Sequence, residues 1–440
     1  MLSVEENELI TRVGPGTLMG NLIRCYWIPA LLSSEVRADG DPVRVMLLGE
    51  QLIAFRETNG KVGLVQNACP HRGASLFFGR NEECGLRCVY HGWKFDVEGN
   101  CVDMPNEPAE SNFKHKVKAT AYPCVERAGM VWTYMGSQQP APPLPDFEGL
   151  SMPEGDYRTT AFQRECNWLQ AIEGDIDTCH IGFLHGGHRK VEDAKPGTFS
   201  YFALKDRAPK YAVIDTEWGA MYGAYRDAEP GFEYWRIAHF FMPFYSMPPQ
   251  NVLGLPNGPR AWVPLDDTHT MVYSVGVKGS QNWSLNQRPS SNADNVLGSG
   301  DGLLPRTTDW FGRFRLAANA RNDYQIDRAE QRSGRSYTGL NGITLQDQAV
   351  TESMGAIYDR STEHLGTSDA MIIRTRRRLI AAARALAEGG TLPPGVEDGS
   401  VYRQRSGGVL LPKGVDWVAA SQELRRAYVH HPEVNVAIAG

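Results

Sequence analysis

The sequence predicts an α+β protein of two domains, an N-terminal antiparallel β domain and a larger α+β domain in which helices flank an antiparallel sheet. Three observations predict this organisation. The 440 residues exceed the length of one ordinary domain. The 45 glycines and 27 prolines favour short elements joined by many turns. Strand-like runs dominate up to a proline-rich segment at residues 138–149, and helical stretches mix with strands beyond it.

The first domain is expected to occupy residues 1–150. An amphipathic helical segment opens it within about the first 35 residues. Short apolar runs separated by turn residues then predict antiparallel strands at 43–49, 52–57, 63–68 and 130–136. The proline-rich segment that follows is expected to be a stiff connection.

The second domain is expected to occupy residues 151–440. Alternating apolar residues predict strands at 211–226, 233–244 and 270–277, and helical periodicity is found at 167–183 and 370–389. Residues 286–305 are polar and rich in glycine and serine. We expect this stretch to form a mobile loop or lid.

Charge and composition exclude several classes of function. The net charge of -6 gives no electrostatic footprint for nucleic acid, and the short basic run at 374–378 is expected to be a solvated helix face. No segment has the features of a secretion signal or of a membrane span, so a cytoplasmic protein without membrane attachment is expected. The glycine-rich segment 14–20 has the wrong spacing for a nucleotide loop. Nicotinamide or flavin binding is therefore left to another protein.

A first metal site is predicted by two short loops that each offer one thiolate and one imidazole. Cys69 and His71 are separated by one residue, and Cys88 and His91 by two, with sixteen residues between the loops. Zinc would need both loops to converge on one tetrahedral ion, for which the first spacing is tight. A two-iron, two-sulfide cluster relaxes that demand, because one iron can take both cysteines and the other both histidines. The cluster is the favoured interpretation, with zinc as the alternative.

A second candidate site lies in residues 166–188, where acids and histidines interrupt an apolar helical frame. Glu173, Asp177 and His180 are spaced i, i+4, i+7, which predicts that they share one helix face. His185 can join His180 on one metal only if the helix distorts or ends near Gly182. A polar helix face would be the simpler interpretation for one histidine. Four titratable groups in apolar surroundings are too costly to bury without a metal or an organised network.

The segments CPHRG and CVYHGW resemble the two ligand loops of a Rieske iron–sulfur domain. This resemblance implies a [2Fe–2S] cluster, with Cys69 and Cys88 on one iron and His71 and His91 on the other. Similarity to the same family extends over segments near both ends of the chain, 12–30 and 353–379.

The segment with Asp177, His180 and His185 resembles the mononuclear iron motif of the Rieske ring-hydroxylating oxygenases: an Asp, two residues, a His, four residues and a second His. The resemblance implies that His180 and His185 bind Fe(II) and that Asp177 bridges His180 to a cluster histidine of a neighbouring subunit. Two histidines and one carboxylate leave positions open for oxygen. By the resemblance, the third ligand is Asp347, an acid that local pattern alone would place at a helix start. Many members have Asn in the place of Glu173, which leaves the role of this candidate catalytic residue open.

Overall similarity is to the phthalate dioxygenase branch. This resemblance implies a homo-oligomer of one large subunit, a trimer or stacked hexamer, served by a separate NADH-dependent reductase with flavin and an iron–sulfur centre. It also implies an aromatic carboxylate as substrate, oxidised with O₂. Bidentate pairing makes arginine the expected partner of a carboxylate. Arg207 and Arg236 are the candidates, and Arg207 is taken as the substrate-binding residue.

Three functions remain open from the sequence. The first is cis-dihydroxylation of phthalate or a related benzoate, and the second is O-demethylation of a methoxylated or aryl-ether aromatic acid by the same centres. A third function, from a different class, is that of a Rieske electron carrier without catalytic iron. The histidine-acid segment and the roughly three hundred residues beyond the first domain argue against a carrier.

Overall fold

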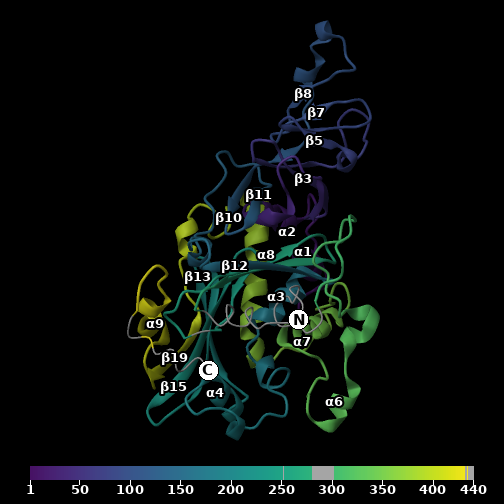
Figure 1. Ribbon diagram of the computed structural model, residues 1–440. Helices are drawn as coiled ribbons and strands as arrows, with labels where there is room; N and C mark the ends of the chain where they lie inside the picture. Colours follow the sequence, from purple (N-terminus) through teal and green to yellow (C-terminus); the bar gives the residue numbers. More distant parts are fainter. Residues whose placement is uncertain (251, 280–301, 432–433, 435–440) are drawn as a thin grey trace.

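The structure is a computed structural model that describes residues 1–250, 252–279, 302–431 and 434. Figure 1 shows an elongated molecule, with small sheets at one end and a large sheet with its helices at the other. Most of the expected loop at 286–305 lies outside the described residues, which resume at Gly302. In the part that the structure describes, no helix combines the length and the apolar character that crossing a membrane requires.

The N-terminal part of the chain forms three antiparallel sheets. The first has the order β1-β11-β10, with strands Trp27–Leu32, Met130–Tyr134 and Cys124–Arg127. The second has the order β2-β3-β4-β9, with strands Val43–Leu47, Glu50–Arg56, Val62–Gln66 and Ala121–Tyr122. The third has the order β5-β6-β7-β8, with strands Arg80–Glu82, Gly85–Arg87, Lys94–Phe95 and Cys101–Asp103. The alternating burial of β2 is the period-2 pattern expected for a strand with one buried face.

The second part contains one large antiparallel sheet, in the order β12-β18-β17-β16-β15-β14-β13. Its strands are Tyr157–Arg164, Thr270–Val277, Arg260–Pro264, Tyr245–Met247, Phe232–Phe241, Gly219–Asp227 and Lys210–Thr216. β19, Gly407–Pro412, also pairs with β15. An antiparallel sheet flanked by helices agrees with the fold class that the sequence predicts.

The longest described helix, α8, Ala370–Gly389, matches the predicted helical segment, and some of the other helices pack against it. Its buried residues Met371, Thr375, Leu379 and Ala383 recur every four positions and so form one apolar stripe. The N-terminal helices α1, Val4–Thr11, and α2, Leu18–Arg24, contact this helix rather than only the first domain's sheets. The other α-helices of the described chain are α3 (Trp168–Ile176), α4 (Phe199–Lys205), α6 (Arg328–Ser333), α7 (Ile343–Glu352) and α9 (Trp417–Arg425). The division at residue 150 stays a prediction.

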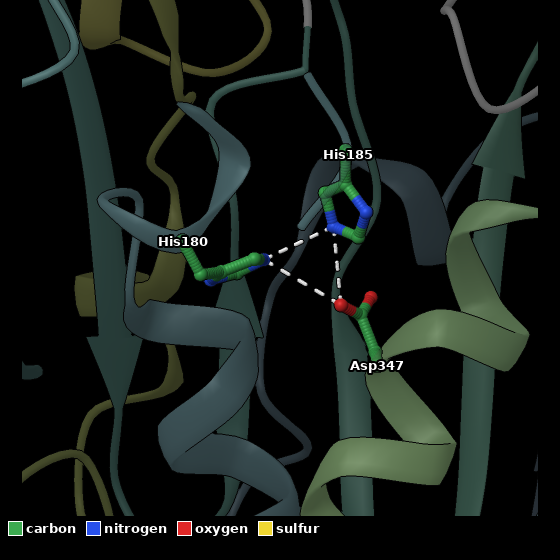
Figure 2. A group of neighbouring side chains, drawn as sticks. All are labelled: His180, His185 and Asp347. Carbon is green, nitrogen blue, oxygen red and sulfur yellow. Dashed lines mark hydrogen bonds and ion pairs between the residues drawn. The ribbon is translucent and has the colours of Figure 1, made fainter. Parts of the chain in front are cut away.

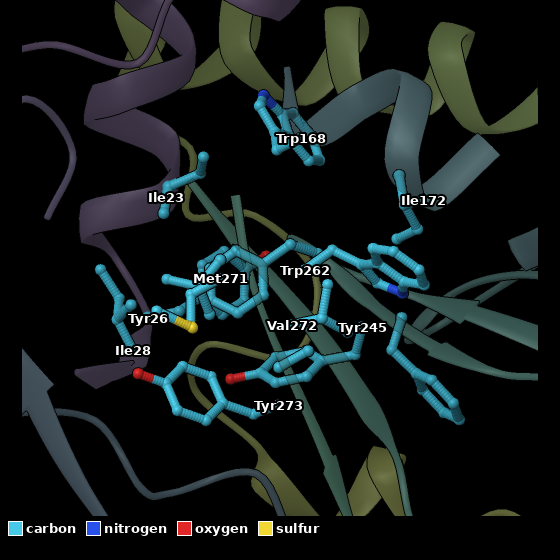
Figure 3. Close-up of a cluster of buried hydrophobic side chains, with 14 of the residues drawn as sticks. Ile23, Tyr26, Ile28, Trp168, Ile172, Tyr245, Trp262, Met271, Val272 and Tyr273 are labelled. Atoms are coloured by element: carbon cyan, nitrogen blue, oxygen red, sulfur yellow. The ribbon is translucent and has the colours of Figure 1, made fainter. Parts of the chain in front are cut away.

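The main hydrophobic core joins the two parts of the chain. Figure 3 shows Ile23 and Ile28 from the N-terminal segment beside Trp168 and Trp262 of the second part. Trp168 is fully buried, and Trp262 is 2% exposed. Each large aromatic side chain removes roughly 150–250 Å² of surface from water. The two parts are therefore held together by apolar burial.

Two expectations about helices need correction. The helix predicted over 167–183 ends at Ile176, because Asp177 adopts an extended backbone (φ -83°, ψ 115°), so Asp177 and His180 do not continue the helix that carries Glu173. His180 begins a separate 3₁₀ turn, His180–Gly182. The basic run 374–378 is also not a uniformly solvated face. Arg376 is only 4% exposed, because it makes buried ion pairs.

Candidate metal centres

The loops that carry the cysteine–histidine pairs have the same backbone geometry. In the first, the N–H of Gly73 donates to the carbonyl of Cys69 at 2.9 Å, and in the second the N–H of Gly92 donates to the carbonyl of Cys88 at the same distance. Both glycines are left-handed, with φ of 76° and 78°, a conformation that costs a residue with a Cβ about 1–2 kcal/mol. At Gly92 a Cβ would also lie 2.6 Å from the Pro105 ring. Each loop therefore turns back tightly after its cysteine.

These loops bring the four candidate ligands together. Cys69 and Cys88 are each 3% exposed, and the rings of His71 and His91 have their centroids 4.4 Å apart. The indole of Trp93 stacks on His71 at 4.2 Å. Nδ1 of each histidine is buried and has no hydrogen-bond partner in the described part of the protein. Buried nitrogens of this kind are costly unless a ligand satisfies them, so the residues fit a metal group at this position.

The arrangement fits a cluster better than a single ion. A site for one ion brings at least three ligand atoms within 4.8 Å of one another. In the described ranges, this is found for His180, His185 and Asp347 and not for the ligands of these two loops. The thiols and imidazoles of the two loops therefore do not close around one point, as tetrahedral zinc requires. Burial raises the pKa of Cys69 to about 11, so its thiolate form needs a bound cation. These four residues would hold a [2Fe–2S] group, whose irons would supply that charge.

The second site joins three side chains from distant parts of the sequence, as Figure 2 shows. Nε2 of His180 lies 3.1 Å from Nε2 of His185, and Oδ1 of Asp347 lies 3.5 Å from the first nitrogen and 3.1 Å from the second. His180 and His185 lie on the segment after α3, and Asp347 is on α7. Two imidazole nitrogens that face each other with their lone pairs repel unless a cation or a proton is shared between them. Two histidines and one carboxylate form the ligand set of non-haem iron(II).

Neighbouring side chains orient both imidazoles. Oδ2 of Asp177 lies 3.2 Å from Nδ1 of His180, and Oε1 of Gln346 lies 2.7 Å from Nδ1 of His185. An acceptor at Nδ1 holds the proton there and leaves Nε2 free as a metal ligand. Sequence reasoning missed Gln346, since an amide next to Asp347 carries no recognisable signal.

Electrostatics at this site favour charged ligands. Burial lowers the pKa of His180, but the hydrogen bond that His180 donates to Asp177 and the charge of Asp347 outweigh this effect, so the pKa is raised. Burial raises the pKa of Asp347, yet the hydrogen bond and charge of His185 together with His180 bring it below its usual range. The carboxylate is therefore ionised, and a metal cation would replace the protons shared with the histidines.

Arg207 has a different role from the substrate binding expected of it. Its Nη1 donates to the carbonyls of Gly182 at 2.6 Å and Gly187 at 2.9 Å, and its Nη2 donates to the carbonyl of Arg189 at 2.7 Å. These bonds close the loop that carries His185. The guanidinium is thus occupied by backbone acceptors, which corrects the expectation.

Glu173 also lies in a different environment from the one expected. Its Oε1 accepts from Nε of Arg376 at 2.6 Å, and its Oε2 accepts from Nη2 of Arg360 at 2.9 Å. Burial raises the pKa of Glu173, but the charges of the two arginines outweigh that effect and lower it. The carboxylate ties α3 to α8 and to the segment at Arg360, and it is not part of the group formed by His180, His185 and Asp347. A catalytic role for Glu173 therefore has no geometric support.

Comparison with known proteins agrees with both centres. Residues 26–123 match the Rieske [2Fe-2S] domain family, and residues 133–435 match the LigXa C-terminal domain like family. The chain is 47% identical over 426 residues to the 3-chlorobenzoate-3,4-dioxygenase oxygenase subunit of Comamonas testosteroni, covering 96% of this chain and 98% of that protein. It is 36% identical to the phthalate 4,5-dioxygenase oxygenase subunit of Pseudomonas putida, covering 95% and 94%.

The fold is also similar to that of solved structures. Dicamba monooxygenase bound to dicamba aligns with a TM-score of 0.54 at 18% identity, covering 83% of this chain and 99% of that one. The sequence matches imply a Rieske [2Fe–2S] cluster and a mononuclear iron as cofactors. The chain belongs to the Rieske non-haem iron ring-hydroxylating oxygenases, as an oxygenase subunit similar to those of the phthalate dioxygenase branch.

Proposed function

We propose that this chain is the oxygenase component of a dioxygenase that converts an aromatic carboxylate, phthalate or a related benzoate, to a cis-dihydrodiol. The oxidant is O₂, and a separate flavin and iron–sulfur reductase supplies electrons from NADH. The observation that carries the proposal is the convergence of His180, His185 and Asp347 on one point. The names of the chlorobenzoate and phthalate dioxygenase relatives support the substrate class.

In this proposal Cys69 and Cys88 hold one iron of the cluster, His71 and His91 hold the other, and His180, His185 and Asp347 hold the mononuclear iron. When bound, the cluster transfers single electrons and the mononuclear iron activates O₂. His71 and His91 are only partly buried, so a cluster held by them would be able to exchange electrons with a partner at the protein surface.

The positions of the two centres support a homo-oligomer, a trimer or stacked hexamer. In Figure 1 the sheet β5–β8, which lies beside the cluster loops, is at the opposite end of the molecule from α7, which carries Asp347. Electron transfer within one chain would be long. Asp177 keeps 23% of its side chain exposed while Oδ2 faces His180, which supports a role for its carboxylate in linking His180 to a cluster histidine of a neighbouring subunit.

Two other functions are separated from this one by product and metal analysis. An O-demethylase of a methoxylated aromatic acid would use the same centres, and an electron carrier would lack the mononuclear iron. The electron-carrier function does not account for the grouping of His180, His185 and Asp347. Burying an ionised carboxylate beside two imidazoles costs free energy unless a cation is bound there.

The test is a substrate screen with the iron-loaded protein, a compatible reductase and NADH. Phthalate isomers, benzoates and methoxybenzoates are supplied one at a time, O₂ uptake is recorded, and products are identified by mass spectrometry. We expect O₂ uptake coupled to a product that gains both oxygen atoms and two hydrogens. Formation of a phenol and formaldehyde from methoxybenzoates alone would establish the O-demethylase instead, and absence of any coupled oxidation would reject both.

A further inference from the structure

Two buried arginines lie on one face of the large sheet. Arg226 on β14 is opposite Tyr234 on β15, and Arg236 on β15 is opposite Ala224 on β14. Side chains two residues apart on a strand, or directly opposite across strands, share a face. Arg226 and Arg236 are therefore diagonal neighbours, with Tyr222 next along the same face. Their exposed fractions are only 3% and 4%.

Neither arginine has an acidic partner in the part of the chain that the structure describes. Arg226 donates from Nε to the backbone carbonyl of Asp206 at 2.6 Å, and Arg236 donates from Nη2 to that of Pro249 at 3.1 Å. Nη1 of Arg226 and both Nε and Nη1 of Arg236 are buried without a hydrogen-bond partner. Burial lowers the pKa of Arg226 to about 10, and the charge of Arg236 adds to the effect.

Several other buried arginines of this protein have acidic partners. Arg360 and Arg376 pair with Glu173, and Arg405 pairs with Glu148 at 2.6 Å. The buried Arg164 and Arg425 have no ion pair in the described ranges, but each donates to a neutral side chain, Thr351 and Ser421 respectively. A buried unpaired charge is strongly destabilising, typically by several kcal/mol. Two such charges side by side, each with free donors, therefore indicate that an anion from outside the chain completes the site.

The arginine pair lies beside the segment that precedes the mononuclear iron ligands. Burial raises the pKa of the Tyr222 phenol. The charge of Arg236 and a hydrogen bond with Thr178 each lower this pKa in part, so both residues lie next to Tyr222. Burial also raises the pKa of Tyr211, and the nearby charge of Asp177 adds to it. The hydroxyls of these two tyrosines and of Thr178 are buried, and they lie close to one another and to Cys179: Thr178 is a hydrogen-bond neighbour of Tyr222, and Tyr211 is one of Cys179.

Aromatic side chains of α4 and β15 border the same place. The Arg236 guanidinium lies 3.8 Å from the ring centre of Phe199, and Phe202 stacks on Tyr234 at 4.7 Å. Cationic donors, phenol hydroxyls and aromatic rings in one location match the chemistry of an aromatic acid: donors for the carboxylate and flat apolar surface for the ring.

We infer that Arg236 and Arg226 are the substrate-binding residues, and that their free N–H groups hold the carboxylate of an aromatic acid close to the mononuclear iron ligands. This inference rests on the proposed function, since it takes an aromatic carboxylate as the substrate. Two arginines can donate hydrogen bonds to one carboxylate from two sides, or each can bind one of the two carboxylates of phthalate. The position fixes which ring edge faces His180 and His185.

The experiment uses calorimetry without reductant to measure how tightly the iron-loaded oligomer binds benzoate, 3-chlorobenzoate and phthalate. Each acid is compared with the corresponding amide. The variants are Arg236→Gln and Arg226→Gln, with Arg236→Lys to restore charge. The matched control is Arg377→Gln, which removes an exposed arginine of α8. We expect wild type to prefer an acid over its amide, and each Gln variant at 226 or 236 to lose about tenfold or more in affinity for the acid alone. Arg236→Lys should recover part of the loss.

A second readout separates a binding role from a structural one. If the two arginines serve to bind a ligand, Arg236→Gln should leave the thermal unfolding midpoint of the ligand-free protein unchanged or raised. The aromatic acid should raise the midpoint of wild type but not that of the variant. Equal losses for acid and amide, acid binding equal to wild type, or wild type that binds none of the acids would overturn the inference. If wild type oxidises an aromatic acid while the variants keep its KM, the inference fails and the proposed function stands. If wild type oxidises none, the proposed function itself fails.

Discussion

The amide oxygen of Gln346 lies 2.7 Å from Nδ1 of His185, one residue before Asp347 on the same helix. Nε2 of the amide donates to Oγ1 of Thr338 at 3.0 Å and to the carbonyl of Leu340 at 3.2 Å. These two acceptors fix the orientation of the amide, so its oxygen faces the histidine. Helix α7 therefore supplies one candidate ligand and orients another.

Gln346→Leu removes the acceptor at Nδ1 of His185, so the ring loses both its orientation and its preferred tautomer. We expect about 10- to 100-fold weaker retention of the mononuclear iron, the range typical for such supporting residues. Metal analysis after dialysis against a chelator measures it. Gln422→Leu, at an exposed position of α9, is the control. Equal iron retention by both variants would show that Gln346 does not support the site.

Asp177→Asn tests the bridge between subunits. The amide keeps an oxygen that can accept from His180, so both metals should stay bound, whereas the negative charge that links the centres is lost. Reoxidation of the reduced cluster with substrate and O₂ should slow, as followed by stopped-flow absorbance. Asp215→Asn, at an exposed position of β13, should behave as wild type. Unchanged reoxidation in Asp177→Asn would refute the bridge.

Arg207→Met tests the corrected role of this arginine. Loss of three hydrogen bonds to the loop at 182–189 costs about 1 kcal/mol each and should release the loop that positions His185. Iron content should fall, and acids and amides should lose affinity alike. Arg189→Met changes an exposed side chain of the same loop and should have no effect. A selective loss of carboxylate binding in Arg207→Met, with full iron content, would restore the substrate-binding expectation.

Glu173→Gln tests the buried ion pairs behind α3. Arg360 is fully buried, and its acidic partner is Glu173, so the variant leaves an uncompensated charge and should lose about 3–5 kcal/mol in the free energy of unfolding. Denaturant unfolding measures the loss, with the exposed Glu192→Gln as the control. A loss below about 1 kcal/mol would show that the pairs contribute little.

The same variant predicts a pH dependence. The pKa of Glu173 is lowered in the folded protein from its ordinary 4.5, so the ionised carboxylate stabilises the fold above that value. This contribution is lost as the pH falls through the folded pKa. The stability difference between wild type and Glu173→Gln should therefore be full at neutral pH and should shrink below about pH 4.5. A difference that grows on acidification would contradict the assignment.

Local patterns in the sequence predicted the parts of the site that local structure builds. The spacing of Cys69, His71, Cys88 and His91 reflects two tight loops, and each loop is determined by a few neighbouring residues. The strand and helix segments likewise followed from periodicity, including α8 over its full length. The helix end at Ile176 was missed, because it depends on the backbone of Asp177 and on hydrogen bonds that its carboxylate accepts from Cys179 and shares with His180.

Contacts between distant segments could not be predicted from local pattern. Asp347 was found through family resemblance, because it lies more than 160 residues from His185 and resembles an ordinary helix acid. The partners of Glu173 are similarly remote, which is why the sequence left open whether this candidate catalytic residue has a structural role. The sequence does not distinguish an arginine that binds backbone carbonyls, as Arg207 does, from one with buried N–H groups that have no partner in the described structure, as Arg236 has. Only three-dimensional packing distinguishes them.

The most direct test of two cooperating iron centres is the iron and acid-labile sulfide content of wild type and Asp347→Ala, measured with the electron paramagnetic resonance signal of the reduced cluster. Wild type should be red-brown and contain about three irons and two sulfides per chain. Asp347→Ala should keep the colour, the signal and about two irons, and should lose substrate-coupled O₂ uptake. Two irons in fully loaded wild type, or unchanged iron content and turnover in Asp347→Ala, would contradict the account.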